Sequence, residues 1–224
     1  MTQNFRHADI LDIVRKDGKV TVAHLAERFG VTLQTIRRDL SEMAELNRLE
    51  RVHGGAVLPS GTTNIQYEER RKLNASAKET ISRACADHIP DACSLFLNIG
   101  TSTEAVARQL ATRKNLMVVT NNMNVAQILA QNNNCKTILT GGTLRGSDNG
   151  LVGTFATDTI RHFKFDIAVI GCSAMDEDGD LLDFDEEEVA VSQTIISHAR
   201  KCFLVADNSK LSRTAPARIA SMQS

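Results

Sequence analysis

The chain has 224 residues, of which 42% are hydrophobic, and its formal net charge is −1. This length suits two globular domains, and the small net charge excludes a protein that attracts nucleic acid through its overall field. No window approaches the roughly 18 apolar residues of a membrane span. The five cysteines form no CxxC pair, which indicates reduced core thiols rather than disulfides or a metal site. We therefore expect a cytoplasmic protein with neither metal nor cofactor.

Three amphipathic helices are predicted near the N-terminus. The first covers Arg6 to Lys16 and ends at Gly18, and the second, VAHLAERF, is followed by Gly30, which suits a helix C-cap. The third begins behind Thr32, whose hydroxyl can cap its free amide groups. Its buried stripe is expected to hold Leu33, Ile36, Leu40 and Met43.

The exposed face of the third helix carries hydrogen-bonding groups. A helix, a tight turn and a second helix form the geometry that places the second helix in the DNA major groove. Arg37 and Arg38 can be read either as a solvated helix face or as a surface that contacts DNA. The first acid of this helix, Asp39, comes only after them, which favours DNA contact. The candidate DNA-binding residues on this helix are Thr32, Gln34, Thr35, Arg37 and Arg38.

A β-hairpin is predicted after the third helix, in the stretch from Arg48 to Pro59. Its Gly54-Gly55 pair supplies the positive φ angles that a two-residue hairpin loop needs. Arg51 and His53 lie on this hairpin and can reach phosphates or a minor groove. The pattern is typical of a winged helix-turn-helix.

The stretches AHLAERFGVTLQTIRRDLSEM and LERVHGGA resemble the N-terminal domain of the DeoR family of bacterial sugar-metabolism repressors. In that family the helix-turn-helix carries T-I-R-R-D-L and the wing ends in H-G-G-A. The similarity covers nearly all of residues 5–58, and it implies that Thr35, Arg37 and Arg38 lie on the DNA-reading helix. We expect a winged helix-turn-helix DNA-binding domain over residues 1–58.

Residues 59–74 contain turn-forming and charged residues and predict a linker. Beyond them, short apolar runs alternate with helical patterns, and each run ends in Gly, Thr, Asn or Asp. Strands that alternate with helices predict a mostly parallel α/β sheet covered on both faces. The apolar runs are residues 94–100, 116–120, 136–142, 165–171 and 201–207.

Ligands bind at the carboxyl ends of the strands in such sheets. The GTST loop, residues 100–103, stands between a strand and a helix and favours an anion. A strand-to-helix turn also needs small capping residues, so the loop alone leaves both readings open. Arg145 and Lys210 follow other strands and favour a phosphate. The predicted ligand-binding residues are Gly100, Thr101, Ser102, Thr103, Thr120, Asn121, Asn122, Gly141, Gly142, Arg145 and Lys210.

Residues 75–211 resemble the DeoR sensor domain, a relative of the ribose-phosphate isomerase and glucosamine-phosphate deaminase fold. The similarity lies in G-T-[ST]-T, T-N-[NS], G-G and D-x-S-K, found here at residues 100–103, 120–122, 141–142 and 207–210. It implies a sensor domain over residues 75–224 that binds a phosphorylated sugar or polyol. The stretches TNNMNVA and LLDFDEEEV are most similar to family members that respond to glycerol 3-phosphate. Members usually continue past D-x-S-K with a strand and a helix, so the C-terminus is expected to be short.

The leading hypothesis is a repressor that binds double-stranded operator DNA as a dimer or tetramer and is released by a phosphorylated inducer. The alternative is a sugar-phosphate isomerase or deaminase-like enzyme, which needs a positioned general base. Nothing in the sequence places a carboxylate of the acidic loop beside the GTST residues, so we expect no enzyme and no catalytic residues. An architectural DNA-binding protein would leave the GTST loop unexplained. The candidate bases are Asp176, Asp178, Asp180, Asp183 and Asp185.

Overall fold

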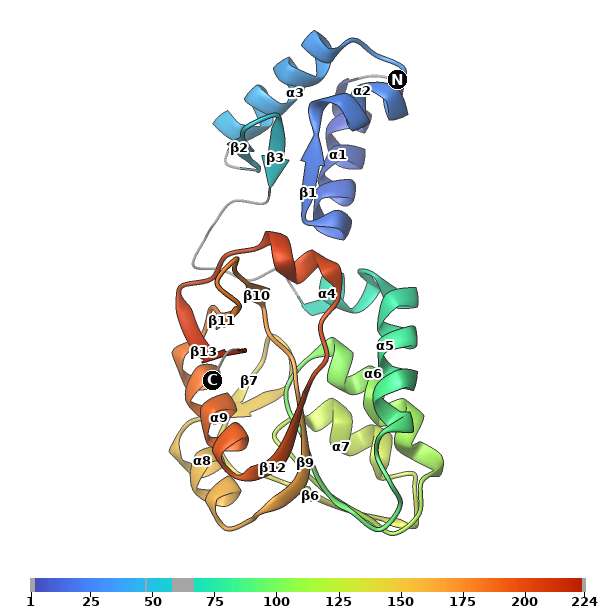
Figure 1. The fold of residues 1–224 in the computed structure, drawn as a ribbon, viewed down its shortest axis with the longest axis vertical. Helices are drawn as coiled ribbons and strands as arrows, with labels where there is room; N and C mark the ends of the chain where they lie inside the picture. Colours follow the sequence, from blue (N-terminus) through green and yellow to red (C-terminus); the bar gives the residue numbers. More distant parts are fainter. Residues whose placement is uncertain (1–2, 47, 58–66, 223–224) are drawn as a thin grey trace.

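The computed structural model describes residues 3–46, 48–57 and 67–222. An N-terminal part made of helices and a small sheet stands on a larger α/β part (Figure 1). Within the described ranges, none of the helices is both long and apolar enough to span a membrane.

The N-terminal part packs short helices around an antiparallel sheet of order β1-β3-β2. Gly30 ends the second helix with a φ of 63°, and the Thr32 hydroxyl accepts a hydrogen bond from the backbone N–H of Thr35 at 3.2 Å. The predicted helix-turn-helix and wing are confirmed, while strand β1 was not predicted. The elements are α1 (Gln3–Asp17), β1 (Lys19–Thr21), α2 (Val22–Phe29), α3 (Leu33–Glu45), β2 (Glu50–Val52) and β3 (Gly55–Val57).

The buried stripe of α3 is one residue shorter than predicted. Ile36, Leu40 and Met43 are fully buried, but Leu33 is 47% exposed. Side chains on a helix lean toward its N-terminus, and Leu33 is the first residue of α3. Its side chain therefore projects past the end of the packed face, and the prediction that it is buried is wrong.

The wing turns one residue earlier than predicted. Val52 pairs with Gly55, so the loop consists of His53 and Gly54, and Gly54 alone of the two glycines has a positive φ, 78°. Gly55 belongs to β3, where a Cβ atom would lie 1.8 Å from the carbonyl oxygen of Val20. This second glycine is thus required by close strand packing and not by the turn.

Part of the segment predicted as a linker is helical. Residues 58–66 lie outside the described ranges, and α4 (Tyr67–Lys72) follows them. The Tyr67 hydroxyl donates to the Glu104 carboxylate, whose two oxygens lie 2.9 and 3.0 Å away. This hydrogen bond fastens α4 to the α/β part.

The α/β part is built on a five-stranded parallel sheet of order β12-β9-β4-β5-β6. All the predicted apolar runs form its strands, and the predicted parallel sheet is confirmed. The strands are β4 (Ser94–Leu97), β5 (Leu116–Thr120), β6 (Cys135–Leu139), β9 (Phe165–Ile170) and β12 (Ala199–Leu204). The helices are α5 (Ala75–Asp87), α6 (Thr101–Gln109), α7 (Met123–Leu129), α8 (Thr154–Arg161) and α9 (Glu186–Ser197).

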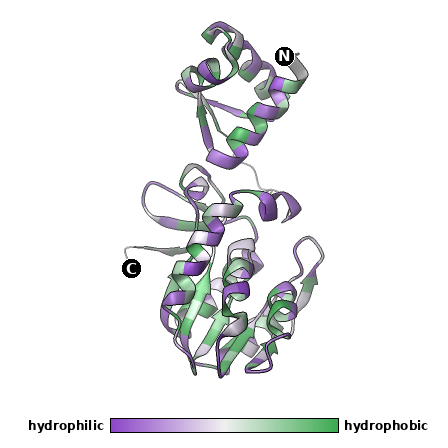
Figure 2. Cartoon of the chain, turned by 90° about the vertical axis from the view of Figure 1, so that its right-hand side faces the viewer, coloured by the Kyte–Doolittle hydropathy of each residue, from purple (hydrophilic) through white to green (hydrophobic). Residues whose placement is uncertain are grey.

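Both faces of this sheet are covered. Leu95 and Leu97 of β4 pack with residues of α5, α6 and α7, while Phe96 points the other way and packs with residues of α8 and α9. Figure 2 shows the apolar strands between these helices. Because side chains alternate across a strand, a continuous apolar run is what a doubly covered sheet requires.

Smaller strands complete the α/β part and were not predicted. The acidic loop forms the hairpin β10 (Ala174–Met175) and β11 (Asp180–Asp183), and β7 (Thr143–Arg145) pairs with β8 (Gly150–Val152). The 3-10 helix η2 (Asn208–Ser212) contains most of the D-x-S-K motif. A further strand, β13 (Ala217–Ser221), follows the motif and pairs antiparallel with β11.

Candidate functional site

The first half of α3 presents polar side chains to solvent. Gln34, Arg37 and Arg38 are exposed, and Arg38 Nε donates to Glu42 one turn later, at 3.0 Å. The hydroxyls of Thr32 and Thr35 lie 2.9 Å apart at the start of the helix. The sequence-predicted residues of this helix therefore share one surface.

The opposite side of α3 is held by a buried ion pair. Arg6 of α1 donates to both carboxylate oxygens of Asp39, from Nε at 2.5 Å and from Nη2 at 3.0 Å. His7 Nε2 lies 3.4 Å from the same carboxylate, and Asp39 is 1% exposed. This pair fixes the orientation of α3 against α1.

The wing is tied to the same helix. Arg51 Nη1 donates to the carbonyl oxygen of Arg37 at 3.1 Å and to the Ser41 hydroxyl at 2.8 Å. His53 is exposed at the tip of the hairpin. The structure therefore gives Arg51 a contact with α3 that the sequence did not reveal.

A polar cavity lies at the carboxyl ends of β4, β9 and β12. Its wall includes the four residues of the GTST loop. Gly100 is the N-cap residue of α6, and the other three residues form the first turn of this helix instead of a loop before it. Helix N-termini present free N–H groups and favour anions. The basic residues of the wall are Arg70, Lys78, Lys210 and Arg213, and the acidic residues are Asp183, Glu188 and Asp207.

Within the described ranges, three residues of the cavity wall carry buried donors without partners. Among the described residues, Arg70 Nε, Arg213 Nη1 and Ser209 Oγ are buried without a hydrogen-bond partner, and all three residues line the cavity wall. A buried donor left unsatisfied costs about 1–3 kcal/mol. These groups therefore fit a ligand that offers several acceptor oxygens.

Lys78 fixes the backbone around Arg70, which is a cationic residue of the cavity wall. Its ammonium donates to the carbonyl oxygens of Arg70 and, at 2.7 Å, of Leu73, at the C-terminal end of α4, where carbonyls have no partner within the helix. The Arg70 guanidinium donates to Asp148 at 3.2 Å. The linker-side helix α4 is thus part of the cavity wall.

The ionisation of the wall favours an anionic ligand. Burial and the nearby charge of Arg213 lower the pKa of Lys210 to about 8, and burial lowers the pKa of Lys78 to about 8. Burial and the charge of Asp183 raise the pKa of Glu188 to about 7, and burial also raises the pKa of Asp183. At neutral pH the lysines remain largely protonated while Glu188 keeps part of its protons, so positive charge prevails.

Family models match both parts of the chain. The model described as the DeoR-like helix-turn-helix domain matches residues 6–62, and the DeoR C terminal sensor domain matches residues 73–224. The chain belongs to the DeoR family. It is a DNA-binding transcriptional regulator with a sensor domain, which confirms the prediction of a regulator rather than an enzyme.

Other members of the DeoR family are similar over the full length. The glycerol-3-phosphate regulon repressor of Escherichia coli (strain K12) is 43% identical over 222 residues, which are 99% of this chain and 88% of that protein. The HTH-type transcriptional repressor CsqR of the same organism is 36% identical over 99% of this chain and 85% of that protein. A D-ribose-5-phosphate isomerase in complex with phospho-erythronic acid has a TM-score of 0.45 and 14% identity over 61% of this chain and 54% of its own. This last similarity concerns only the course of the backbone.

The structure places Arg145 outside the cavity wall, contrary to our prediction. Its guanidinium is enclosed by carboxylates: it donates to both oxygens of Asp148 at 3.0 and 2.8 Å, to Asp185 at 2.7 Å and to Glu188 at 2.6 Å. A guanidinium has five donors in a fixed plane, and four of its contacts here are already made. Arg145 therefore positions Glu188, and it is not among the residues that line the cavity.

The polar turn after β5 also lies away from the cavity wall. The Thr120 hydroxyl donates to Leu97 O at 2.6 Å, Asn121 Nδ2 donates to Leu151 O at 3.1 Å, and Asn122 Oδ1 caps α7. These hydrogen bonds stabilise the turn, although Asn121 Oδ1 is buried without a hydrogen-bond partner among the described residues. The predicted contact of these three residues with a ligand is not supported by this geometry.

Gly142 is required by close packing, whereas a Cβ atom on Gly141 would make only an ordinary contact. Gly142 has a φ of 132°, and a Cβ atom there would lie 2.5 Å from the carbonyl oxygen of Val152. A Cβ atom on Gly141 would lie 3.6 Å from Phe155. Neither glycine lines the cavity, so the structure departs from their prediction as ligand-binding residues.

Sequence reasoning missed much of the cavity wall. Arg70 comes from the predicted linker, and Arg213 follows the D-x-S-K motif in a stretch without a recognisable pattern. Asp183 of the acidic loop does line the cavity together with the GTST residues, although we expected no such carboxylate. The one sequence signal was the unusual density of acids between residues 176 and 188.

Proposed function

We propose that this regulator represses a carbohydrate or polyol catabolic operon and leaves its operator when a phosphorylated polyol, glycerol 3-phosphate, fills the cavity of the sensor domain. The observation that carries the proposal is the group of unpaired donors on Arg70, Ser209 and Arg213 next to the first turn of α6. We further propose that it binds operator half-sites as a dimer or tetramer, in keeping with the two-fold symmetry of most such sites.

A phosphate group suits this wall better than a neutral ligand. It carries close to two negative charges at pH 7 and several strong acceptor oxygens. The wall offers arginine and lysine donors together with the free N–H groups of a helix N-terminus, which is a common way to hold phosphate. A neutral polyol would leave these cations without a counter-charge.

The same wall also supports a ligand that carries hydroxyl groups. Asp183 and Glu188 line it, and carboxyl oxygens accept hydrogen bonds from hydroxyls. The relative with 43% identity is a glycerol-3-phosphate regulon repressor by name. Charge and hydroxyl acceptors support a phosphorylated polyol, and this relative favours glycerol 3-phosphate among such ligands.

Release from DNA tests this proposal. An operator fragment selected from random DNA and labelled for fluorescence anisotropy is titrated with protein at fixed salt, with glycerol 3-phosphate or glycerol present. We expect saturating glycerol 3-phosphate to weaken operator binding by about 5- to 150-fold, the usual range of coupling between sites. Glycerol, which lacks the phosphate, is expected to have no effect.

The alternative outcomes separate the parts of the proposal. Release by a hexose phosphate and not by glycerol 3-phosphate would replace the inducer and keep the phosphate-sensing role. Indifference to every phosphate in a panel of sugars and polyols would contradict the role of the cavity itself.

We also propose that Arg37 and Arg38 contact the operator. Arg37→Ala and Arg38→Ala are each expected to weaken operator binding by about 1–3 kcal/mol, the range for a base-reading arginine. Neither side chain supports the fold: Arg38 pairs with Glu42 at the surface, and the contact of Arg51 is made with the backbone of residue 37. Unfolding temperatures should therefore stay unchanged.

The control for this test is Arg83→Ala, which removes an exposed arginine of α5 that pairs with Glu79. This substitution changes the net charge by the same amount as Arg37→Ala or Arg38→Ala, but Arg83 lies on the α/β part of the chain. Operator affinity within about twofold of wild type is expected for this control. If both α3 variants also bind like the wild type, the surface of α3 is solvated and the assignment is wrong.

A further inference from the structure

Asn74 has an unusual role at the start of α5. It is the N-cap residue of this helix and has left-handed backbone angles, φ 52° and ψ 38°. An N-cap asparagine usually has extended backbone angles and accepts a hydrogen bond from the first turn. Within the described part of the chain, Asn74 makes no such cap bond with its side chain. Its side chain is therefore available for another contact.

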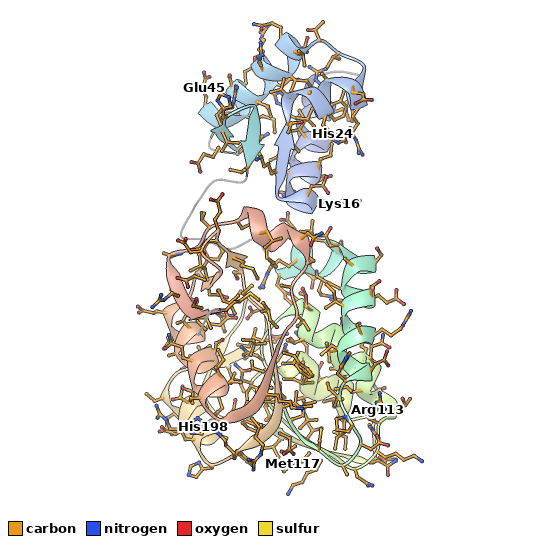
Figure 3. All side chains as sticks on the ribbon, in the orientation of Figure 1. Lys16, His24, Glu45, Arg113, Met117 and His198 are labelled. Carbon is orange, nitrogen blue, oxygen red and sulfur yellow. The ribbon has the colours of Figure 1, made fainter. Side chains whose placement is uncertain are left out.

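Both donor positions of the Asn74 amide are used between the two parts of the chain. Nδ2 donates to the carbonyl oxygen of Lys16 at 3.0 Å and to Oδ1 of Asp207 at 2.9 Å. Lys16 lies in the last turn of α1, where carbonyls lack partners within the helix. Figure 3 shows Lys16 at the end of α1 that faces the α/β part. One side chain thus joins the DNA-binding domain to the sensor domain.

Asp207 connects this bridge to the cavity. It lines the cavity wall, and the same oxygen that accepts from Asn74 accepts from the backbone N–H of Ser209 at 2.9 Å. Ser209 is one of the residues with an unpaired buried donor. A ligand that engages Ser209 is therefore connected to Asn74 by two hydrogen bonds, both accepted by Asp207 Oδ1.

A second contact between the two parts is weaker. Arg15 of α1 lies 3.6 Å from Glu69 of α4, and these side chains are 33% and 43% exposed. Exposed ion pairs contribute about 0–1 kcal/mol and are screened by salt. The half-buried Asn74 bridge is therefore the better candidate for a specific link.

We propose that Asn74 is the positioning residue that couples the ligand cavity to the DNA-binding domain. This inference rests on the proposed release by a phosphorylated ligand. A ligand can shift DNA affinity only if it binds two arrangements of the protein unequally. The arrangement in which Asn74 joins Lys16 to Asp207 is one of them, and a phosphate that draws Ser209 and Lys210 into the cavity displaces Asp207 from this bridge.

The test measures the coupling itself. Dissociation constants for glycerol 3-phosphate are determined for the free protein and for the protein bound to its operator, and their ratio is the coupling factor. Asn74→Gly removes the amide and keeps the left-handed backbone accessible. We expect the coupling factor of this variant to fall to within about threefold of 1, while the free protein binds glycerol 3-phosphate at least as tightly as the wild type, because the ligand no longer has to displace the bridge.

Asn115→Gly is the matched control. Asn115 is also a left-handed asparagine, with a φ of 57°, and it lies before β5, far along the chain from the bridge. The chemical change and the backbone effect are the same, so this control should keep the wild-type coupling factor. A loss of stability alone would appear in both variants.

Asn74→Asp provides a second variant if Asn74→Gly is poorly folded. It keeps the shape of the side chain but replaces the donor with oxygens that face Lys16 O and Asp207, so its coupling factor should also approach 1. Wild-type coupling in a folded Asn74 variant would overturn the inference and leave the proposed function intact. Absence of ligand-dependent release from the wild type itself would overturn both.

Discussion

Asp39→Ala is expected to lower the free energy of unfolding of the DNA-binding domain by about 3–5 kcal/mol, because removal of one partner of a buried ion pair leaves the other charge uncompensated. Arg6 is 8% exposed and donates two hydrogen bonds to this carboxylate. Without it, the guanidinium must stay buried unpaired or move out and disturb the packing of α1. Such a loss is a large share of the stability of a small domain.

Thermal unfolding followed by circular dichroism measures this effect, and hydrogen exchange in α1 and α3 assigns it to the DNA-binding domain. Asp12→Asn is the control, since Asp12 is a 75% exposed partner of Arg15 on the same helix α1. Its effect should stay below about 1 kcal/mol, as for other surface pairs. A loss below about 1 kcal/mol for Asp39→Ala as well would show that the Arg6 pair orients α3 without stabilising the domain.

The parts of the fold that sequence predicted correctly depend on local chemistry. Gly30 and Thr32 mark the ends of α2 and α3 because a left-handed cap and a hydroxyl cap involve residues only a few positions apart. Continuous apolar runs such as residues 165–171 also predict buried strands correctly, because the pattern lies within a few neighbouring residues. Leu33 was misplaced because helical periodicity shows which side of a helix faces the core but does not show where the packed interface stops.

The cavity depended on long-range contacts and was only partly predictable. The GTST residues and Lys210 carry recognisable patterns and line the cavity as expected. Arg145 looks equally suitable in the sequence, yet Asp148, Asp185 and Glu188 surround it. Arg70 reaches the wall because α4 folds back over α6, a contact that no local pattern encodes.

Lys210→Met is expected to weaken binding of glycerol 3-phosphate by about 10- to 100-fold, because a hydrogen bond to a charged group contributes about 1.5–3 kcal/mol. Lys210→Arg keeps the charge and should retain most of the affinity. Isothermal titration calorimetry on the free protein measures both variants. Wild-type affinity for Lys210→Met would place the phosphate away from η2 and leave Arg70 and the α6 N-terminus as its remaining contacts.

The pH dependence of the affinity for glycerol 3-phosphate also tests whether Lys210 contacts the phosphate. Burial and the charges of Arg213 and Arg70 lower the pKa of Lys210, while Asp207 and Cys172 raise it, and the net result is a pKa of about 8. A bound phosphate favours the charged ammonium and raises this pKa, so affinity is greatest below pH 8 and falls as pH rises above it. By linkage the fall approaches tenfold per pH unit for one lysine.

The comparison between wild type and Lys210→Arg isolates this lysine. Lys78 and Glu188 titrate in the same range, with pKa values of about 8 and about 7, and both remain in the variant. The phosphate has a second pKa near 6, so above pH 7 it is a dianion in both titrations. Between pH 7 and 9.5 the ratio of the two affinities should therefore change by about 30-fold in favour of the arginine, since pH 9.5 lies about 1.5 units above the pKa of Lys210. Parallel pH profiles would mean that Lys210 does not contact the phosphate, since arginine stays charged throughout this range.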